Sequence, residues 1–206
     1  MSPRVAIVDY GLCNVDSVRR AVEENGGDAY VVRDGNDLDR PDHIVLPGVG
    51  AFGDAMHNLV DRNLDKALAR EVLEVGVPML GICLGMQLLA TSSEESPEVD
   101  GLGWIDATVQ RLQPTATDRR VPHLGWNDVV TTQSHPLFEG IESGTDFYFV
   151  HSYHVCPVDS SVTIATSTYC DGFTAALAAG PVFGVQFHPE KSQRAGFALL
   201  SNFLGL

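Results

Sequence analysis

Short apolar runs alternate with longer mixed stretches through the first half of the chain. The apolar runs at residues 5–9, 29–33, 43–46 and 78–82 predict strands. Between them we expect one helix that begins near Asn14, a good N-cap, and ends at the glycines 26–27. A second helix is expected from about residue 61 to 75. Strands that are apolar throughout and separated by helices are typical of a parallel sheet covered on both faces.

The second half of the chain has a different pattern. Strand-like segments at 102–112, 128–132, 147–155, 162–169 and 182–187 are linked by turns rich in Gly, Pro, Asp and Ser. A last helix is expected over about 192–203. We find no repeat, low-complexity tract or linker. The prediction is therefore one α/β domain, residues 1–206, a three-layer sandwich whose mostly parallel central sheet has an antiparallel extension.

Composition and charge exclude some classes of protein. With 27 acidic and 13 basic residues the formal net charge is −14, which argues against nucleic-acid binding. A general compositional bias, a salt-adapted surface and an acidic docking face would each give this count. We expect no signal peptide, membrane span or metal site, and the four irregularly spaced cysteines favour the reducing cytoplasm.

One cysteine has the setting of a nucleophile. Cys83 lies between the apolar run 78–82 and an apolar helical stretch, with Gly81 and Gly85 placed symmetrically around it. This is the pattern of a nucleophile elbow, a sharp strand-to-helix turn whose tightness excludes a Cβ two residues away on either side. The amides at the start of a helix favour the thiolate over the thiol. A cysteine alone is more often a small buried hydrophobe, but this glycine frame favours a nucleophile.

A candidate base and its partner stand near the end of the chain. His188 and Glu190 belong to the segment 185–190, Val-Gln-Phe-His-Pro-Glu. Strand alternation would place both side chains on one face, with Pro189 ending the strand pairing. A histidine held by a carboxylate and able to take a proton from sulfur would complete a Cys-His-Glu triad.

A glycine-rich loop follows the third predicted strand. In residues 46–54, Leu-Pro-Gly-Val-Gly-Ala-Phe-Gly-Asp, glycines allow backbone N–H groups to turn toward a ligand. The loop could offer an amide to an oxyanion, together with the N–H of Leu84. It could instead hold a phosphate, although it lacks the spacing of a P-loop or of G-x-G-x-x-G.

Taken together, these segments resemble the class I (triad) glutamine amidotransferases, which have a flavodoxin-like fold. The resemblance is carried by 81–87 (Gly-Ile-Cys-Leu-Gly-Met-Gln), 187–190 (Phe-His-Pro-Glu) and 47–50 (Pro-Gly-Val-Gly). It implies a glutaminase that works through a glutamyl thioester on Cys83, without a cofactor, with His188 as acid/base and Glu190 orienting it. It also implies an oxyanion hole from Val49, Gly50 and Leu84. The implied glutamine contacts are Gln87, Glu95, His151, Ser152 and Tyr153, although His151 could equally be a core residue.

Within that family the chain is most similar to the glutaminase subunits of imidazole glycerol phosphate synthase. The segments 47–56, 122–127, 147–153 and 188–192 carry this likeness. It implies a heterodimer with a (β/α)₈-barrel cyclase that receives ammonia for histidine biosynthesis. The implied contacts with that partner are Gly11, Asn14, Trp126, Tyr148 and Lys191.

Two positions depart from the usual pattern of this subfamily, and three rival functions stay open. Cys13 stands where the family usually has glycine, and Leu124 replaces methionine, a change that conserves volume. The rivals are a glutaminase subunit of another synthase (anthranilate, aminodeoxychorismate or pyridoxal phosphate), a non-catalytic interaction protein and a cysteine hydrolase. We also expect a peptide flip near Val49 and Gly50, so that the oxyanion hole is poorly formed without partner and ligand.

Overall fold

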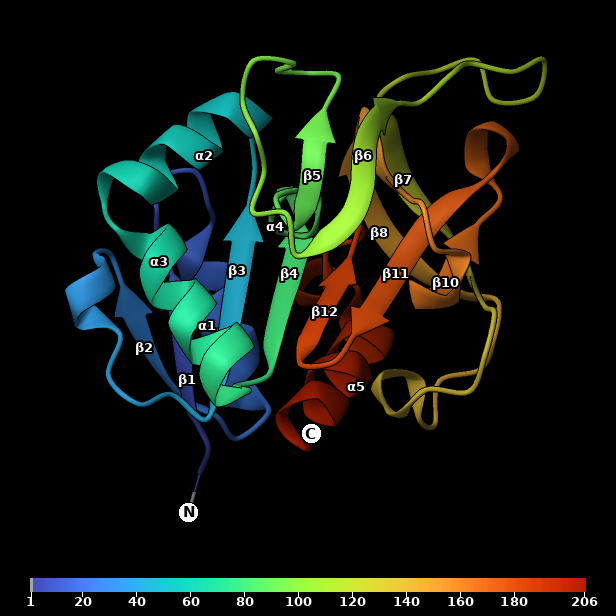
Figure 1. Ribbon diagram of the computed structural model, residues 1–206. Helices are drawn as coiled ribbons and strands as arrows, with labels where there is room; N and C mark the ends of the chain where they lie inside the picture. Colours follow the sequence, from blue (N-terminus) through green and yellow to red (C-terminus); the bar gives the residue numbers. More distant parts are fainter. Residues whose placement is uncertain (1) are drawn as a thin grey trace.

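The computed structural model describes residues 2–206 and contains a nine-stranded sheet with helices on both faces (Figure 1). The elements of the first half are β1 (Arg4–Val8), α1 (Val15–Glu24), β2 (Asp28–Val32), β3 (His43–Gly48), α2 (Phe52–Asp61), α3 (Leu64–Ala69), β4 (Met79–Cys83) and α4 (Leu84–Gln87). Those of the second half are β5 (Ala90–Ser93), β6 (Ile105–Arg111), β7 (His123–Thr131), β8 (Thr145–His151), β9 (Tyr153–Pro157), β10 (Thr163–Ser167), β11 (Phe173–Ala179), β12 (Val182–Val185) and α5 (Gln193–Leu204).

The large sheet joins the two halves of the chain. Its strand order is β2-β1-β3-β4-β12-β11-β10-β7-β8. The pairings from β2 to β12 are parallel and those from β12 to β8 are antiparallel, so the parallel sheet has the expected antiparallel extension. Because β12 comes from the end of the chain and pairs with β4, the two segments that carry Cys83 and His188 are brought side by side.

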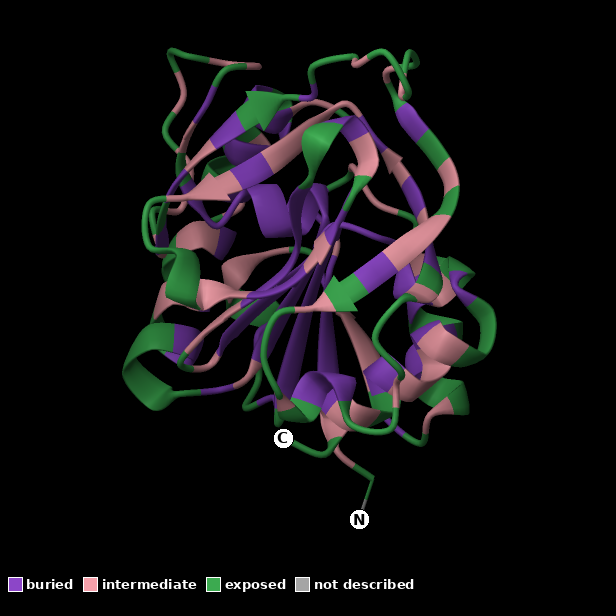
Figure 2. Ribbon diagram, turned by 90° about the vertical axis from the view of Figure 1, so that its right-hand side faces the viewer, coloured by how far each residue is buried: buried purple, intermediate pink, exposed green. Residues whose placement is uncertain are grey.

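The core lies on both faces of this sheet. One cluster joins α1 and α5 to the sheet, and the other joins α2 and α3 to the opposite face. The parallel strands β1, β3, β4 and β12 are buried along almost their whole length, as the centre of the sheet in Figure 2 shows, which explains their uninterrupted apolar runs. The edge strand β2 is only partly buried. The three-layer α/β prediction is confirmed.

The helix expected over 61–75 is wrong in its start and its continuity. The structure has α2 first, beginning at Phe52, then a break at Asn63 with φ 52°, then α3 and a π-helix over Arg70–Val75. The glycines around residue 52 conceal the start of α2 in the sequence. Gly53 is required there because a Cβ would approach the Ser96 hydroxyl to 2.8 Å.

The second half departs from prediction at three strands. The single strand expected over 147–155 is two strands, which part at Ser152 and enter different sheets. β5 and β11 were not predicted. β11 is buried over its first five residues and is rich in alanine. It was missed because it has few of the β-branched residues that usually indicate a strand. β9 forms a small second sheet with β5 and β6.

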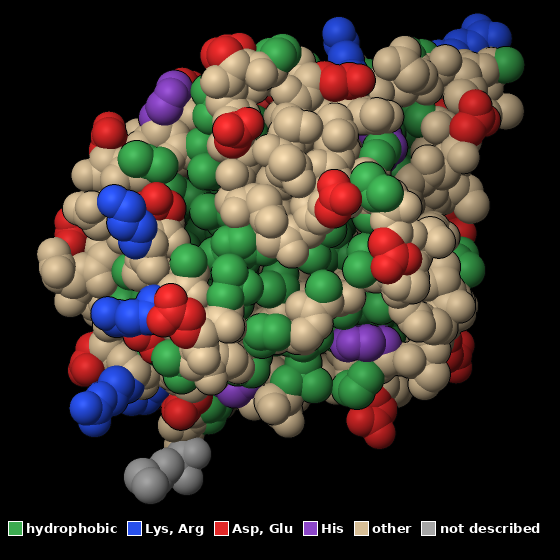
Figure 3. Space-filling view, viewed as in Figure 1, with side chains coloured by type: hydrophobic (Ala, Val, Ile, Leu, Met, Phe, Trp, Pro, Cys, Tyr) green, Lys and Arg blue, Asp and Glu red, His purple; other side chains and the backbone are tan. Residues whose placement is uncertain are grey.

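Acidic side chains are scattered over the face in Figure 3, and apolar side chains are visible in a central strip. This face therefore offers no single acidic patch to a basic partner. No helix within residues 2–206 has the length and hydropathy needed to cross a bilayer.

Candidate active site

The elbow at Cys83 is a strained strand-to-helix turn. Cys83 has φ 54° and ψ −109°, a conformation that L residues rarely adopt. A Cβ at Gly85 would run into the carbonyl oxygen of Leu46, and one at Gly81 would lie 2.7 Å from the carbonyl oxygen of Gly85. Both glycines are therefore needed sterically, as the sequence pattern predicts. The helix that follows, α4, is a single turn of four residues.

His188 and Glu190 form a buried pair behind the elbow. His188 Nδ1 lies 2.8 Å from Glu190 Oε1, and both side chains are 3% exposed. The strand argument for their common face is wrong, because β12 ends at Val185 and Glu190 lies in a 3₁₀ turn, Pro189–Lys191. This turn, not strand alternation, brings the carboxylate back to the imidazole.

The surroundings of His188 favour its protonated form. Burial disfavours a charge on the ring, but Cys83 and Glu190 outweigh this cost and raise the pKa of His188 to about 9. Its Nε2 is buried without a hydrogen-bond partner among the described residues. No other group within residues 2–206 competes for this nitrogen, so it is the atom that can exchange a proton with Cys83, and the raised pKa favours the state in which the proton is on the ring.

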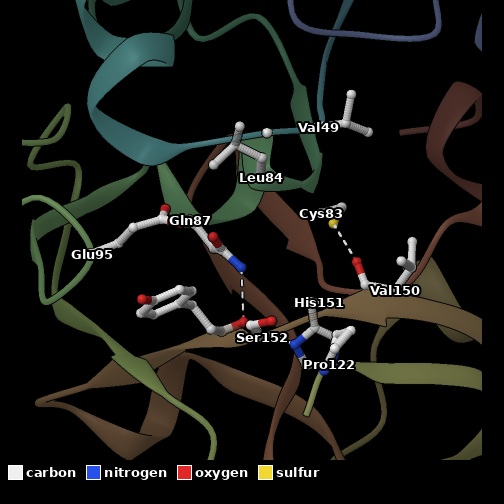
Figure 4. A pocket seen from close by; sticks show the side chains of 11 residues that line it. Val49, Cys83, Leu84, Gln87, Glu95, Pro122, Val150, His151 and Ser152 are labelled. Carbon is white, nitrogen blue, oxygen red and sulfur yellow. Dashed lines mark hydrogen bonds between the residues drawn. The ribbon is translucent and has the colours of Figure 1, made fainter.

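In the resting site the sulfur has two other contacts. The Cys83 thiol donates to the carbonyl oxygen of Val150 at 3.8 Å, and Gln186 Nε2 lies 3.6 Å from Sγ (Figure 4 shows the first). Gln186 was not predicted as a site residue. Its signal in the sequence is a polar residue inside an otherwise apolar strand end, two positions before His188.

A pocket of about 280 Å³ opens beside Cys83. Figure 4 shows Val49 and Leu84 on one side of it and His151 and Ser152 on the other. The pocket is lined by every residue predicted for the oxyanion hole and glutamine contacts, and additionally by Pro122 and Val150, which were not predicted: Val49, Gly50, Cys83, Leu84, Gln87, Glu95, Pro122, Val150, His151, Ser152 and Tyr153. Its volume is sufficient for a ligand of amino-acid size.

The glycine-rich loop lies next to the nucleophile. Gly48 is opposite Cys83 in the β3–β4 register, so Val49 and Gly50 follow at the pocket rim. The N–H of Val49 donates to the carbonyl oxygen of Leu12 at 2.8 Å, which removes it from the pocket. Gly50 has φ +105°, a conformation suited to glycine. The N–H of Leu84 begins α4 and has no acceptor within that helix.

Two more polar residues close the pocket. Glu95 Oε2 accepts from the N–H of Phe52 at 2.8 Å, so it ties the start of α2 to the loop after β5. The Nδ1 of buried His151 lies 2.8 Å from the carbonyl oxygen of Tyr153, to which it donates a hydrogen bond. Its Nε2 lies 3.1 Å from His123 Nδ1, also within hydrogen-bond distance. Burial lowers the pKa of His151 to about 3, so this ring is neutral near pH 7. It is both a core residue and a pocket residue.

The residues expected at a partner interface lie near His188, the candidate catalytic base. Trp126 packs edge-on against Tyr148 with ring centroids 6.0 Å apart, and Lys191 Nζ lies 5.9 Å from the Tyr148 ring. The backbone carbonyl of Tyr148 accepts the N–H of His188 at 2.9 Å. Exposed Asn14 caps α1, shares a small cavity with His188 and Lys191, and follows exposed Gly11.

Cys13 makes a local contact in the turn after β1. Its thiol donates to Asp9 Oδ1 at 3.5 Å, and burial together with Asp9 raises its pKa to about 12. The thiol is therefore protonated and unreactive, which agrees with a structural role.

A nucleophilic elbow, a buried His-Glu pair and a small polar pocket on an α/β sheet define a cysteine-dependent amide-hydrolysing site. The chain belongs to the glutamine amidotransferase class-I family, whose model matches residues 6–205.

Its relatives specify the branch of that family. The chain is 48% identical over 206 residues to "Imidazole glycerol phosphate synthase subunit HisH 2" of Nitrobacter winogradskyi, covering 98% of this chain and 97% of that protein. It is 47% identical over 199 residues to "Imidazole glycerol phosphate synthase subunit HisH" of Moorella thermoacetica, covering 97% of this chain and 93% of that protein.

Solved structures share the fold at lower identity. PurLQS from Thermotoga maritima superposes with a TM-score of 0.77 at 22% identity, covering 100% of this chain and 99% of that chain. A structure described as a glutamine amidotransferase gives a TM-score of 0.77 at 19% identity, covering 98% of this chain and 99% of that chain.

Proposed function

We propose that the chain is the glutaminase subunit of an imidazole glycerol phosphate synthase and that residues 1–206 act as one amidotransferase domain. It hydrolyses glutamine to glutamate and passes the ammonia to a cyclase subunit. The observation that carries this is the Cys83–His188–Glu190 arrangement beside an amino-acid-sized pocket, in a chain 48% identical to a HisH subunit over nearly its whole length.

The chemistry follows from the geometry of the triad. The Cys83 proton passes to His188 Nε2, and Sγ attacks the side-chain amide carbon of glutamine. The tetrahedral oxyanion collapses as His188 returns the proton to the amide nitrogen, so ammonia leaves and a thioester remains. Water, deprotonated by His188, then attacks the thioester carbon and releases glutamate and the Cys83 thiol.

The pocket residues divide into two roles in this proposal. The N–H groups of Leu84 and of the Val49–Gly50 segment stabilise the oxyanion, each donor contributing about 3 kcal/mol to the transition state. Gln87, Glu95 and residues 151–153 hold the glutamine. Because the Val49 N–H is bound to Leu12, the resting site is incomplete, and the loop must reorganise before turnover.

The partner proposed is a (β/α)₈-barrel cyclase that docks over Trp126, Tyr148 and Lys191, with Gly11 and Asn14 at the edge. Exposed aromatic side chains are common anchors of protein interfaces, and Trp126 is 47% exposed. The Tyr148 carbonyl accepts from the His188 N–H, so a partner on this surface would lie one residue away from the base.

The test is selective complex formation. The chain is mixed separately with the cyclase subunit of an imidazole glycerol phosphate synthase and with an anthranilate synthase subunit, and co-elution is measured. We expect a 1:1 complex with the cyclase alone and glutamate release stimulated by the cyclase's own ligand. Trp126→Ala should weaken binding at least tenfold, whereas Val158→Ala, exposed elsewhere, should not.

Three outcomes would select the rivals instead. Binding to the anthranilate synthase subunit would assign the chain to another synthase. Binding to the cyclase without any glutamate release would indicate a non-catalytic interaction protein. Turnover of small amides or peptides in the absence of every partner would indicate a cysteine hydrolase.

A further inference from the structure

A buried carboxamide touches the sulfur of Cys83. Gln186 directly follows β12 and is 0% exposed. Its backbone N–H donates to the carbonyl oxygen of Ala175 at 2.8 Å, which fixes the residue against β11. Its side-chain nitrogen lies 3.6 Å from Cys83 Sγ. The residue therefore contacts a reacting atom, and neither the triad nor the oxyanion loop accounts for it.

The hydrogen-bond network determines which end of this amide faces the sulfur. Gln87 Nε2 lies 2.9 Å from the carbonyl oxygen of Tyr153, which only accepts, so the nitrogen of Gln87 is correctly placed there. The same nitrogen lies 3.0 Å from Gln186 Oε1. Gln186 must therefore present its oxygen to Gln87 and its N–H group to the sulfur.

The two contacts of the sulfur favour opposite protonation states. The carbonyl oxygen of Val150 accepts from the thiol and cannot bind a thiolate. The N–H group of Gln186 binds a sulfur anion more strongly than a neutral thiol. When the proton moves to His188, the Gln186 contact strengthens and the Val150 contact is lost.

We propose that Gln186 is the thiolate-binding residue of this site: its amide N–H stabilises the ionised sulfur of Cys83, while its oxygen holds Gln87 at the pocket wall. The inference rests on the proposed function for its role in turnover. Gln186 thus couples the substrate pocket to the nucleophile, because one rigid carboxamide contacts both.

The test measures ionisation of Cys83 directly. The rate of iodoacetamide labelling is measured as a function of pH. Peptide mass spectrometry distinguishes labelling of Cys83 from labelling of Cys13, Cys156 and Cys170. The other titratable groups around the sulfur are His188, backed by Glu190, and Tyr10, together with Glu95, His151 and Tyr153 in the pocket, and the Gln186 substitutions alter none of them. Gln186→Met keeps the length of the side chain but removes the donor. The labelling midpoint should rise by about one pH unit, with labelling at neutral pH about tenfold slower.

Two further variants separate the two contacts of Gln186. Gln186→Glu keeps an oxygen for Gln87 but places a carboxylate beside the sulfur, so the midpoint should rise at least as far. Gln87→Met should raise KM for glutamine and shift the midpoint less than Gln186→Met does, because the N–H donor of Gln186 remains. Gln186→Met should mainly lower kcat.

A matched control is available at the other Gln–Cys contact. The Cys156 thiol donates to Gln110 Oε1 on β6 at 3.4 Å, so Gln110→Met makes the same substitution beside a cysteine outside the pocket, where the amide accepts and does not donate. It should shift nothing at Cys83. Thermal unfolding by circular dichroism verifies that each variant folds.

The inference is overturned if the Cys83 midpoint is unchanged in folded Gln186→Met, or in folded Gln186→Glu should the Met variant not fold. Labelling requires neither glutamine nor a cyclase. Failure of the proposed function would therefore appear as absent turnover with the midpoint shift still present.

Discussion

The backbone N–H of Val49 donates to the carbonyl oxygen of Leu12, 2.8 Å away, and this bond holds the oxyanion loop in a resting conformation. The loop is directly beside Cys83 in the sheet register, so the nucleophile is assembled while one of its oxyanion donors is engaged elsewhere. In the proposed function, release of this backbone hydrogen bond frees the Val49 N–H for the oxyanion. A partner that breaks this bond would activate the enzyme without moving the triad.

The Val49 amide should report this change by hydrogen exchange. We expect it to be protected in the isolated chain and to lose protection when the cyclase and its ligand are bound, because its acceptor is exchanged for a transient oxyanion. The amide of Val45, in the middle of β3, serves as the control and should stay protected. Stimulated turnover with unchanged protection at Val49 would contradict the loop's role.

Glu190→Gln should lower kcat by roughly 10²-fold or more, with little effect on KM. The carboxylate orients His188 and stabilises its charged form. An amide would orient the ring less well and would hardly stabilise its charge. The pH at which His188 titrates should fall. Glu24→Gln, on the exposed end of α1, is the matched control, and equal activity of the two variants would remove Glu190 from the triad.

Buried histidines should make the fold acid-sensitive. Burial lowers the pKa of His123 to about 4, below the ordinary histidine value of about 6.5, so the unfolded chain binds a proton more readily. The stability this ring contributes is therefore complete above pH 6.5 and is lost as the pH falls toward 4.

Urea unfolding at pH 7.5 and 4.5 tests this, with His123→Phe as the variant. His123 stacks on Tyr169 with centroids 4.0 Å apart, so Phe fits the stack and removes the titration. The variant should lose less stability on acidification than wild type, whereas exposed His57→Phe should behave as wild type. Identical acid loss in all three would refute the assignment. His188 acts in the opposite sense, since its raised pKa gives stability that is lost as pH rises through about 9.

Removal of one hydroxyl should not weaken the core. Tyr10 is fully buried, and its hydroxyl has no hydrogen-bond partner among residues 2–206. Tyr10→Phe should therefore be neutral or raise the free energy of unfolding by about 1 kcal/mol. In Tyr30→Phe, the control, the lost hydroxyl donates to the carbonyl oxygen of Asp39 at 3.3 Å in a more exposed setting. A marked loss of stability in Tyr10→Phe would reveal a hidden partner for the hydroxyl.

The sequence predicts those features whose causes are local. The glycines around Cys83 identify the elbow because a Cβ on either meets backbone atoms, and buried parallel strands require uninterrupted apolar runs. The start of α2 was missed because it depends on contacts with Glu95 and Ser96, which are 43 residues away in the sequence. The break at Asn63, where φ is 52°, was also missed.

Features that depend on tertiary contacts were harder to predict from the sequence. The 3₁₀ turn that brings Glu190 to His188 and the split of 147–155 into two strands are not set by residue type alone. Gln186 could have been noticed as a polar residue in an apolar run, but its orientation follows only from Gln87 and Tyr153.

The central claim is that Cys83 is the nucleophile of a partner-activated glutaminase, and glutamate release tests it most directly. The rate is measured with glutamine, the cyclase subunit and the cyclase's ligand, for wild type and for Cys83→Ala. The account predicts ligand-stimulated release by wild type and none above background by Cys83→Ala, although the variant still binds the cyclase. Undiminished release by Cys83→Ala would contradict it.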